Sequence, residues 1–183
     1  VLNTLGKIDD KIHKNREIND YLEEMAKTIY DYWFVQFDFT DEKGNPYKSS
    51  NGEMIYTDDH ILPKGWKICK IRDIISSICT GLNPRDNFSL GSGNIKYITV
   101  KNLTTKGTLD FTGCDTIDES ARTIIHNRSD IQIGDILFAS IAPLGRCYLI
   151  QAEPTDWDIN ESVFSIRANV DVVTPTFLYL YFM

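Results

Sequence analysis

The stretch Leu62-Pro-Lys-Gly-Trp-Lys-Ile68 divides this sequence into two unlike parts. Residues 1–36 have the apolar spacing of one long helix, whereas short apolar runs and turn residues dominate beyond the stretch. We therefore expect an α+β protein, in which a long helix of coiled-coil type precedes a β-rich domain. The expected segments are a spacer helix over 1–36, a connector over 37–62 and a β-rich domain over 63–183, an arrangement typical of a protein that positions a binding module.

Length and composition indicate one globular domain with an appendage. The chain has 183 residues, of which 42% are hydrophobic. No apolar run is long enough to span a bilayer, and no basic-then-apolar leader opens the sequence, so we expect neither membrane insertion nor secretion. The first residue is not Met and the last segment stops within an apolar pattern, so we expect a fragment of a longer chain.

The four cysteines, Cys69, Cys79, Cys114 and Cys147, are widely spaced and form no C-x-x-C pair. This spacing argues against a zinc site, and single thiols in β-rich segments are ordinarily small core residues. We expect reduced thiols, which fit a cytoplasmic location.

The net charge of −7 is unevenly distributed. Residues 1–62 hold 7 Lys and Arg against 13 Asp and Glu, whereas residues 63–183 hold 12 against 13. The helix and connector therefore carry the acidity, and the β-rich domain is nearly neutral. Because a neutral domain can still present a local basic face to phosphates, composition neither supports nor excludes DNA binding.

A heptad seam runs along the predicted helix, since seam positions recur in alternating steps of three and four. Such a stripe needs a surface to cover it, and we expect a second helix, from elsewhere in the full chain or from another copy. Packing on the chain's own domain is the alternative. The seam consists of Leu5, Ile8, Ile12, Asn15, Asn19, Leu22, Ala26, Ile29 and Trp33.

The remaining sequence predicts a loop followed by short strands. Residues 38–62 contain turn dipeptides and few candidates for a core, which favours a loop. Residues 71–79 fit a short helix or a strand, and Pro175–Met183 fits a helix start capped by Thr174. Candidate strands are 96–100, 108–111, 135–141, 146–150 and 162–167.

No catalytic constellation is recognisable in the sequence. The histidines have no Ser or Cys partner nearby in the sequence, and neither a G-x-S-x-G elbow nor a P-loop is present. Asn83-Pro-Arg-Asp86 matches only part of the Asn-Pro-Pro-aromatic loop of amino-methyltransferases. We expect no catalytic residue, no metal site and no cofactor bound by this chain.

Polar residues instead gather in loops beside the predicted strands. Asn, Arg and Lys can read base edges in the major groove, and Ser, Thr and backbone amides can bind phosphates. The same residue types are also ordinary turn formers, so these residues alone do not decide between the two readings. The loops are 80–87, 99–106, 139–146 and 158–162.

Much of the sequence resembles the specificity subunits of type I restriction-modification systems. Leu5-Gly-Lys-Ile-Asp-Asp-Lys-Ile-His-Lys-Asn-Arg-Glu-Ile-Asn19 and Leu22-Glu-Glu-Met-Ala-Lys-Thr-Ile-Tyr-Asp-Tyr-Trp-Phe-Val35 are similar to the conserved-region helix of that family. Similarity to the family's connector is carried by Phe37-Asp-Phe39, Gly44-Asn-Pro-Tyr-Lys-Ser-Ser-Asn-Gly52 and Ile61-Leu-Pro-Lys-Gly-Trp66. Similarity to its target recognition domain is carried by Tyr97-Ile-Thr-Val-Lys-Asn-Leu103, Gly134-Asp-Ile-Leu-Phe-Ala-Ser140, Gly145-Arg146 and Asn160-Glu-Ser-Val-Phe-Ser-Ile-Arg167.

The resemblance implies a non-catalytic subunit that recognises DNA. Such subunits usually carry two recognition domains, each reading half of a split double-stranded DNA target, separated by two long antiparallel helices. Methyltransferase subunits supply S-adenosylmethionine chemistry, and restriction subunits supply ATP- and Mg-dependent translocation and cleavage. Only one recognition domain is present here, which fits half of a full subunit or most of a half-size one.

Recognition domains diverge with their targets, so side-chain chemistry and loop placement select the candidate contacts. We expect contacts with base edges from Arg85, Lys101, Asn102 and Arg146. We expect contacts with phosphates or bases from Asn83, Asn87, Thr99, Thr104, Ser140 and Ser162. Two other classes remain open: a protein-only assembly or regulatory module of such a system, and a hydrolase whose site assembles only in space.

Overall fold

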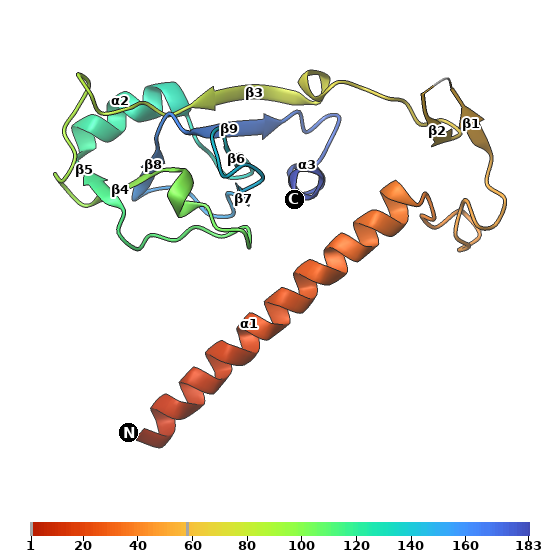
Figure 1. Ribbon diagram of the computed structural model, residues 1–183, viewed down its shortest axis with the longest axis horizontal. Helices are drawn as coiled ribbons and strands as arrows, with labels where there is room; N and C mark the ends of the chain where they lie inside the picture. The colour runs from red at the N-terminus through yellow and green to blue at the C-terminus, as the bar shows by residue number, and fades with distance from the viewer. Residues whose placement is uncertain (1, 58) are drawn as a thin grey trace. The chain divides into compact units, whose positions relative to one another are not determined.

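The computed structural model describes residues 2–57 and 59–183 (Figure 1). It separates into two compact units, Val1–Ile68 and Cys69–Met183. The first unit consists mainly of a long helix, and the second contains the larger sheets. The α+β class and the long N-terminal helix predicted from the sequence are confirmed.

The long helix, α1, spans Leu2–Tyr30 and continues as a π-helical turn over Asp31–Val35. At 1.5 Å per residue, α1 is about 44 Å long. Phe37 ends the helix in the left-handed region with φ of 63°, and the Asp38 amide donates back to the Tyr32 carbonyl over 2.9 Å. This closing bond satisfies one of the carbonyls that every helix leaves free at its C-terminal end.

The connector is more ordered than the predicted loop, so that prediction is wrong for part of it. β1 (Met54–Tyr56) pairs antiparallel with β2 (Ile61–Pro63). Trp66 packs against Phe34, Phe37 and Phe39, with ring centroids 5.4–5.8 Å apart. These aromatic rings give the connector a small core of its own, which its turn-rich sequence concealed.

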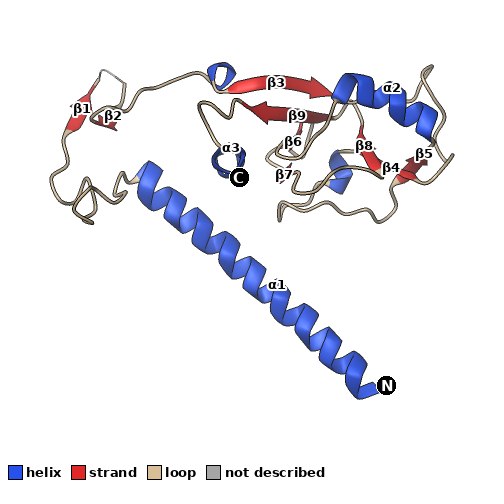
Figure 2. Cartoon of the chain, turned by 180° about the vertical axis from the view of Figure 1, so that it is seen from behind, coloured by secondary structure: helices blue, strands red, loops and turns tan. Residues whose placement is uncertain are grey.

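The second unit contains two sheets and two α-helices, and Figure 2 shows how they are arranged. The four-stranded sheet has the order β3-β9-β6-β7, and the three-stranded sheet has the order β5-β4-β8. β4 and β8 are parallel, and the other neighbours in both sheets are antiparallel. The strands are β3 (Ile75–Thr80), β4 (Ile95–Ile98), β5 (Asp115–Ile117), β6 (Ile136–Ala139), β7 (Cys147–Leu149), β8 (Trp157–Ile159) and β9 (Val163–Ala168).

Several local predictions for the second unit hold, and others fail. Residues 71–79 form a 3-10 turn, Ile71–Asp73, followed by β3, and Thr174 caps α3 (Pro175–Phe182) as expected. Residues 108–111 form no strand, because only an isolated bridge joins Leu103 to Leu109. The helix α2 (Glu119–Ser129), capped by the Asp118 carboxylate, and the strands β5 and β8 were not predicted.

Three apolar clusters form the core of the second unit. Ile98, Leu137 and Val163 belong to the first, in which both sheets take part. α2 covers a second cluster through Ala121 and Ile125, and α3 covers a third through Leu178. α2 and α3 each pack one face against the strands and so hold them in place. The loops that join the strands therefore start from fixed positions.

A buried ion pair joins two of the segments that carry the family resemblance. Asp135, 1% exposed, follows Gly134, whose φ of 89° favours glycine. Arg167 on β9 donates to both carboxylate oxygens of Asp135, over 2.7 and 2.9 Å. Ser165 donates to the same carboxylate over 3.2 Å, so the start of β6 is fastened to β9.

Among the helices described for residues 2–57 and 59–183, none combines the length and the apolar character that crossing a bilayer requires.

Candidate nucleic-acid interface

Three loops of the second unit meet where β4, β6 and β8 end and β9 begins. The Asn160 amide donates to the Ile98 carbonyl over 2.9 Å, and the Val100 amide donates to Ser162 Oγ over 3.2 Å. The Ser140 amide donates to the Ser162 carbonyl over 3.0 Å. We name residues 99–104, 140–146 and 160–162 together the loop junction.

The first loop of the junction is a 3-10 turn, Val100–Asn102, closed by reciprocal caps. Thr99 Oγ1 accepts from the Lys101 amide over 3.3 Å, and Asn102 Oδ1 accepts from the Thr99 amide over 2.9 Å. Asn102 Nδ2 donates to the Asp110 carbonyl over 2.9 Å. The Asn102 amide group is therefore buried and engaged on both sides, whereas Lys101 is exposed.

The second and third loops are joined through serine side chains. Ser162 Oγ donates to Asn160 Oδ1 over 2.5 Å, and Ser140 Oγ donates to the Ser162 carbonyl over 2.8 Å. Ser162 itself is buried. Its hydroxyl accepts from the Val100 amide and donates to Asn160, so it holds the loops together and is not available to bind a ligand from solvent.

Arg146 and Thr104 also lie in the junction. Arg146 Nη1 donates to the Leu103 carbonyl over 3.1 Å, and its buried Nε has no hydrogen-bond partner among the described residues. Thr104 Oγ1 lies 2.8 Å from Thr108 Oγ1 across a tight turn. The half-buried guanidinium of Arg146 thus ties one loop to another.

A pocket of about 410 Å³ opens beside the junction. Lys101, Asp110, Asp115 and Glu161 supply the charged groups of its lining. Tyr97 also lines the pocket, and its hydroxyl donates to the Leu82 carbonyl over 2.6 Å. Burial, and next the carboxylates of Glu161 and Asp115, raise the pKa of Tyr97, so its phenol stays protonated.

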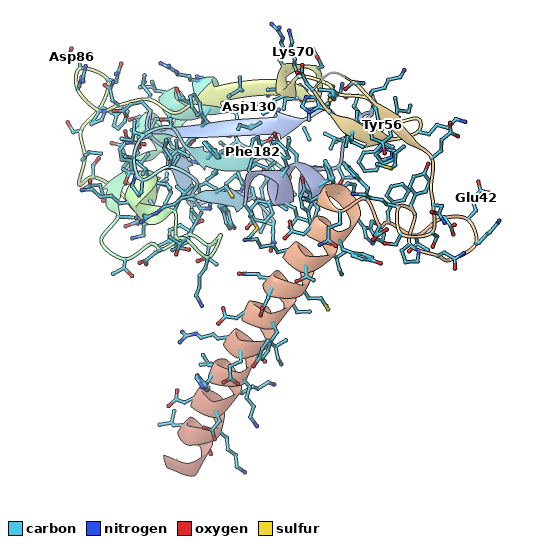
Figure 3. The ribbon with its side chains drawn as sticks, turned by 45° about the vertical axis from the view of Figure 1, so that its right-hand side comes forward. Glu42, Tyr56, Lys70, Asp86, Asp130 and Phe182 are labelled. Carbon is cyan, nitrogen blue, oxygen red and sulfur yellow. The ribbon has the colours of Figure 1, made fainter. Side chains whose placement is uncertain are left out.

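The other three predicted contacts, Asn83, Arg85 and Asn87, lie on the loop between β3 and β4. Figure 3 shows Asp86 at the outer tip of this loop. Arg85 is exposed and has a φ of 21°, and Asn87 Nδ2 donates to the Asn83 carbonyl over 3.0 Å. The structure therefore brings seven of the ten predicted DNA contacts into the junction and leaves these three on a separate loop.

Sequence reasoning missed one polar cluster, under α2. Asp158 on β8 is fully buried and accepts from Ser129 Oγ and from the Ile159 amide, both over 2.8 Å. Its other oxygen lies 3.4 Å from His126 Nδ1 without hydrogen-bond geometry. Burial raises the pKa of Asp158. The signal in the sequence was a carboxylate between the apolar residues Trp157 and Ile159.

This cluster lacks the arrangement of a catalytic triad. In a triad the serine hydroxyl faces the histidine, whereas here Ser129 Oγ donates to Asp158. Among the described residues, no group of three or more His, Cys, Asp and Glu could hold a metal ion. The cluster instead fastens α2 to β8.

The seam of α1 is exposed along its length. Its large apolar residues are between 40% and 54% exposed, from Trp33 to Leu5. Asn15 and Asn19 are exposed and Ala26 is half-buried. The helical partner expected for this seam stays a prediction.

Comparison with known proteins identifies type I restriction enzymes as relatives. No protein family model matches the chain. The specificity subunit of the type I restriction enzyme MjaIX from Methanocaldococcus jannaschii is 28% identical over 105 residues, which cover 56% of this chain. The matched residues span only 22% of that relative's length. The relative is a specificity subunit, so the resemblance seen in the sequence is confirmed.

Two solved structures are also similar. One is described as "Structural basis underlying complex assembly and conformational transition of the type I R-M system". The match covers 98% of this chain and 39% of the chain in that structure, with 14% identity and a TM-score of 0.46. The other is the HsdS subunit from Thermoanaerobacter tengcongensis, for which the match covers 97% of this chain and 38% of that subunit, with 16% identity and a TM-score of 0.45.

Proposed function

We propose that this chain is a DNA-recognition part of a type I specificity subunit. In this proposal residues 69–183 read one half of a split double-stranded DNA target, and α1 packs against a second conserved helix. Methyltransferase and restriction subunits dock on the assembled protein in the cytoplasm and supply the chemistry that uses S-adenosylmethionine, ATP and Mg. The chain itself catalyses no reaction.

The loop junction is the observation that supports this proposal most directly. Residues 99–104, 140–146 and 160–162 are far apart in the sequence, yet backbone and serine hydrogen bonds fix them side by side. Rigid loops that present exposed polar side chains are suited to reading base edges, because little ordering remains to be paid for on binding. The relative's name supports the same class of function.

Burial and hydrogen bonding distinguish two groups among the ten candidate contacts, and together these groups hold six of the ten. Asn102 and Ser162 are buried and Arg146 is half-buried, and their polar atoms hold the loops. We therefore assign them to the support of the interface. The exposed residues Arg85, Asn87 and Lys101 are the ones we assign to direct contact with DNA.

Substitution of the two exposed cations tests this assignment. With the protein assembled with a methyltransferase subunit, Arg85→Ala and Lys101→Ala should each weaken DNA binding. A lost phosphate contact should lower the salt slope by about 0.9, and a lost base contact should relax one position of the target. Lys7→Ala on α1 removes the same charge and should change neither property. Unchanged affinity and sequence preference in both variants would make the assignment wrong.

A protein-only assembly or regulatory module is the second candidate, and one observation favours it. Four arginines of the second unit are held in internal bonds: Arg122 to the Pro154 carbonyl, Arg128 to Thr80, Arg146 to the Leu103 carbonyl and Arg167 to Asp135. These bonds engage four of the ten Lys and Arg side chains in residues 69–183, which leaves fewer cations to meet a phosphate backbone. A well-formed complex with a methyltransferase subunit that shows no DNA preference would favour this candidate.

A further inference from the structure

The pocket beside the loop junction has a charge balance that excludes phosphate. Three carboxylates, Asp110, Asp115 and Glu161, line it against the single ammonium group of Lys101. A phosphate in this pocket would meet a net repulsion, since like charges at close range oppose binding. Bases carry no net charge, and their exocyclic amino groups are hydrogen-bond donors that a carboxylate accepts.

Asp110 differs from the other two carboxylates because a hydrogen bond already engages it. Asp110 Oδ1 accepts from the Thr112 amide over 2.9 Å, which lowers the pKa of Asp110 and commits one oxygen to its own turn. Asp115 is also exposed, but it lies on β5, opposite Tyr97 in the register and outside the loop junction. Glu161 is exposed, and its carboxylate forms no hydrogen bond or ion pair with another residue in the described part of the chain.

The backbone of Glu161 is held firmly although its side chain is free. Asn160 Oδ1 accepts from both the amide and the hydroxyl of Ser162, which closes a tight turn around Glu161. The Asn160 amide is bonded to β4 and the Ser162 carbonyl to Ser140. Glu161 is therefore displayed from a preorganised turn, which reduces the entropy lost when its carboxylate binds a donor.

Lys101 lines the same pocket as Glu161, so the loop junction displays an ammonium donor and an unengaged carboxylate acceptor together. In the major groove a G·C pair presents two acceptors on guanine, O6 and N7, and one donor on cytosine, the N4 amino group. Lysine is suited to the guanine acceptors and glutamate to the cytosine donor. The two side chains together complement one G·C pair.

We propose that Glu161 and Lys101 read a single G·C base pair of the target, with Glu161 accepting from cytosine N4 and Lys101 donating to guanine. This inference rests on the proposed function and deepens it, because it names the base pair and the two residues that specify it. Glu161 was not among the contacts predicted from the sequence.

Selection from a randomised duplex pool tests the inference, using the protein assembled with a methyltransferase subunit. The native protein should enrich a motif that includes a G·C pair at a fixed position. Glu161→Gln should reduce the preference for cytosine at that position by about 5- to 150-fold and leave the other positions unchanged. Glu153→Gln makes the same substitution at an exposed residue of the second unit outside this pocket, and serves as the matched control with no expected change.

Lys101→Met provides a second, independent variant in case Glu161→Gln disturbs folding. This variant should reduce the preference for guanine in the same base pair. Relaxation at a different pair, an unchanged cytosine preference in Glu161→Gln, or an equal effect of Glu153→Gln would overturn the inference while the proposed function stands. A native complex that enriches no motif would overturn the proposed function itself, and this inference with it.

Discussion

Ile12 on α1 is 45% exposed, whereas Leu137 on β6 is fully buried, and this pair summarises how the two units differ. The first unit presents its apolar stripe outward and gathers its aromatic rings around Trp66. The second unit buries its apolar residues in three clusters and uses its polar side chains to join loops. The second unit therefore buries its apolar residues internally, whereas the apolar seam of α1 is exposed, and a helical partner that covers it stays a prediction.

The buried ion pair of the second unit should give the largest effect. Asp135→Ala removes a buried carboxylate that is the main partner of Arg167. Breaking a buried pair typically costs about 3–5 kcal/mol of unfolding free energy, and we expect the lower end because Arg167 is 30% exposed and keeps its bond to Asp130. Asp10→Ala on the exposed face of α1 should cost less than about 0.5 kcal/mol. Urea denaturation measures both, and equal effects would remove the contrast between the units.

A pair of apolar truncations should give the next largest effect. Leu137→Ala opens a cavity in the core and should cost about 2–5 kcal/mol. Ile12→Ala should cost less than about 1 kcal/mol in the chain alone but weaken association with a helical partner. Denaturation of the chain alone and analytical ultracentrifugation of the assembled protein separate the two effects. A large loss of stability in the Ile12 variant alone would show that the seam is already covered within the chain.

Trp66→Ala should give an intermediate effect confined to the first unit. Removing the ring takes away its contacts with Phe34, Phe37 and Phe39, at a cost of about 2 kcal/mol for a half-buried side chain. Hydrogen exchange should accelerate at the amide of Tyr47, which donates to the Phe39 carbonyl. Equally accelerated exchange in β6 and β9 would contradict the independence of the units.

The smallest effect is a pH dependence of opposite sign in the two units. The Ser49 hydroxyl and amide donate to Asp38 and lower its pKa below the ordinary 3.8. The stabilisation from Asp38 is therefore present above pH 3.8 and is lost as pH falls through the folded-state pKa. Burial raises the pKa of Asp158, despite its bonds from Ile159 and Ser129 and its proximity to His126. Its contribution is greatest below pH 3.8 and is lost as pH rises through the folded-state pKa.

Thermal melts of Asp38→Asn and Asp158→Asn between pH 3 and 7 test the sign. Relative to the native chain, Asp38→Asn should become more destabilised as pH rises, and Asp158→Asn should become less so. The two variants following the same trend would contradict this assignment.

The long helix could be predicted because its signal is local. Each seam residue lies three or four positions from the next, so the pattern needs no knowledge of the rest of the fold. The start of α3, with Thr174 as its N-cap, was also predicted from a local pattern and is confirmed. By contrast, α2 was missed because its buried face is short: Ala121, Ile125 and Ser129 alone are buried on it.

The loop junction could be foreseen only in part. The sequence drew attention to the three loops that meet in the structure, but the bond from the Val100 amide to Ser162 Oγ joins residues 62 positions apart. No local pattern distinguishes an Asn102 that is buried in a capping network from one that is free to meet a base. Glu161 was not selected from the sequence although it is exposed, because an acidic side chain does not suggest a DNA contact until the pocket around it is known.

Exchange of the two units tests the central claim most directly. Residues 69–183, or separately residues 1–68, would be replaced by the corresponding part of another specificity subunit, and each assembled protein would be offered a randomised duplex pool. The account predicts a split motif, one half of which changes with residues 69–183 and stays the same when residues 1–68 are exchanged. A half-motif that follows residues 1–68, or no enrichment in a well-formed complex, would contradict it.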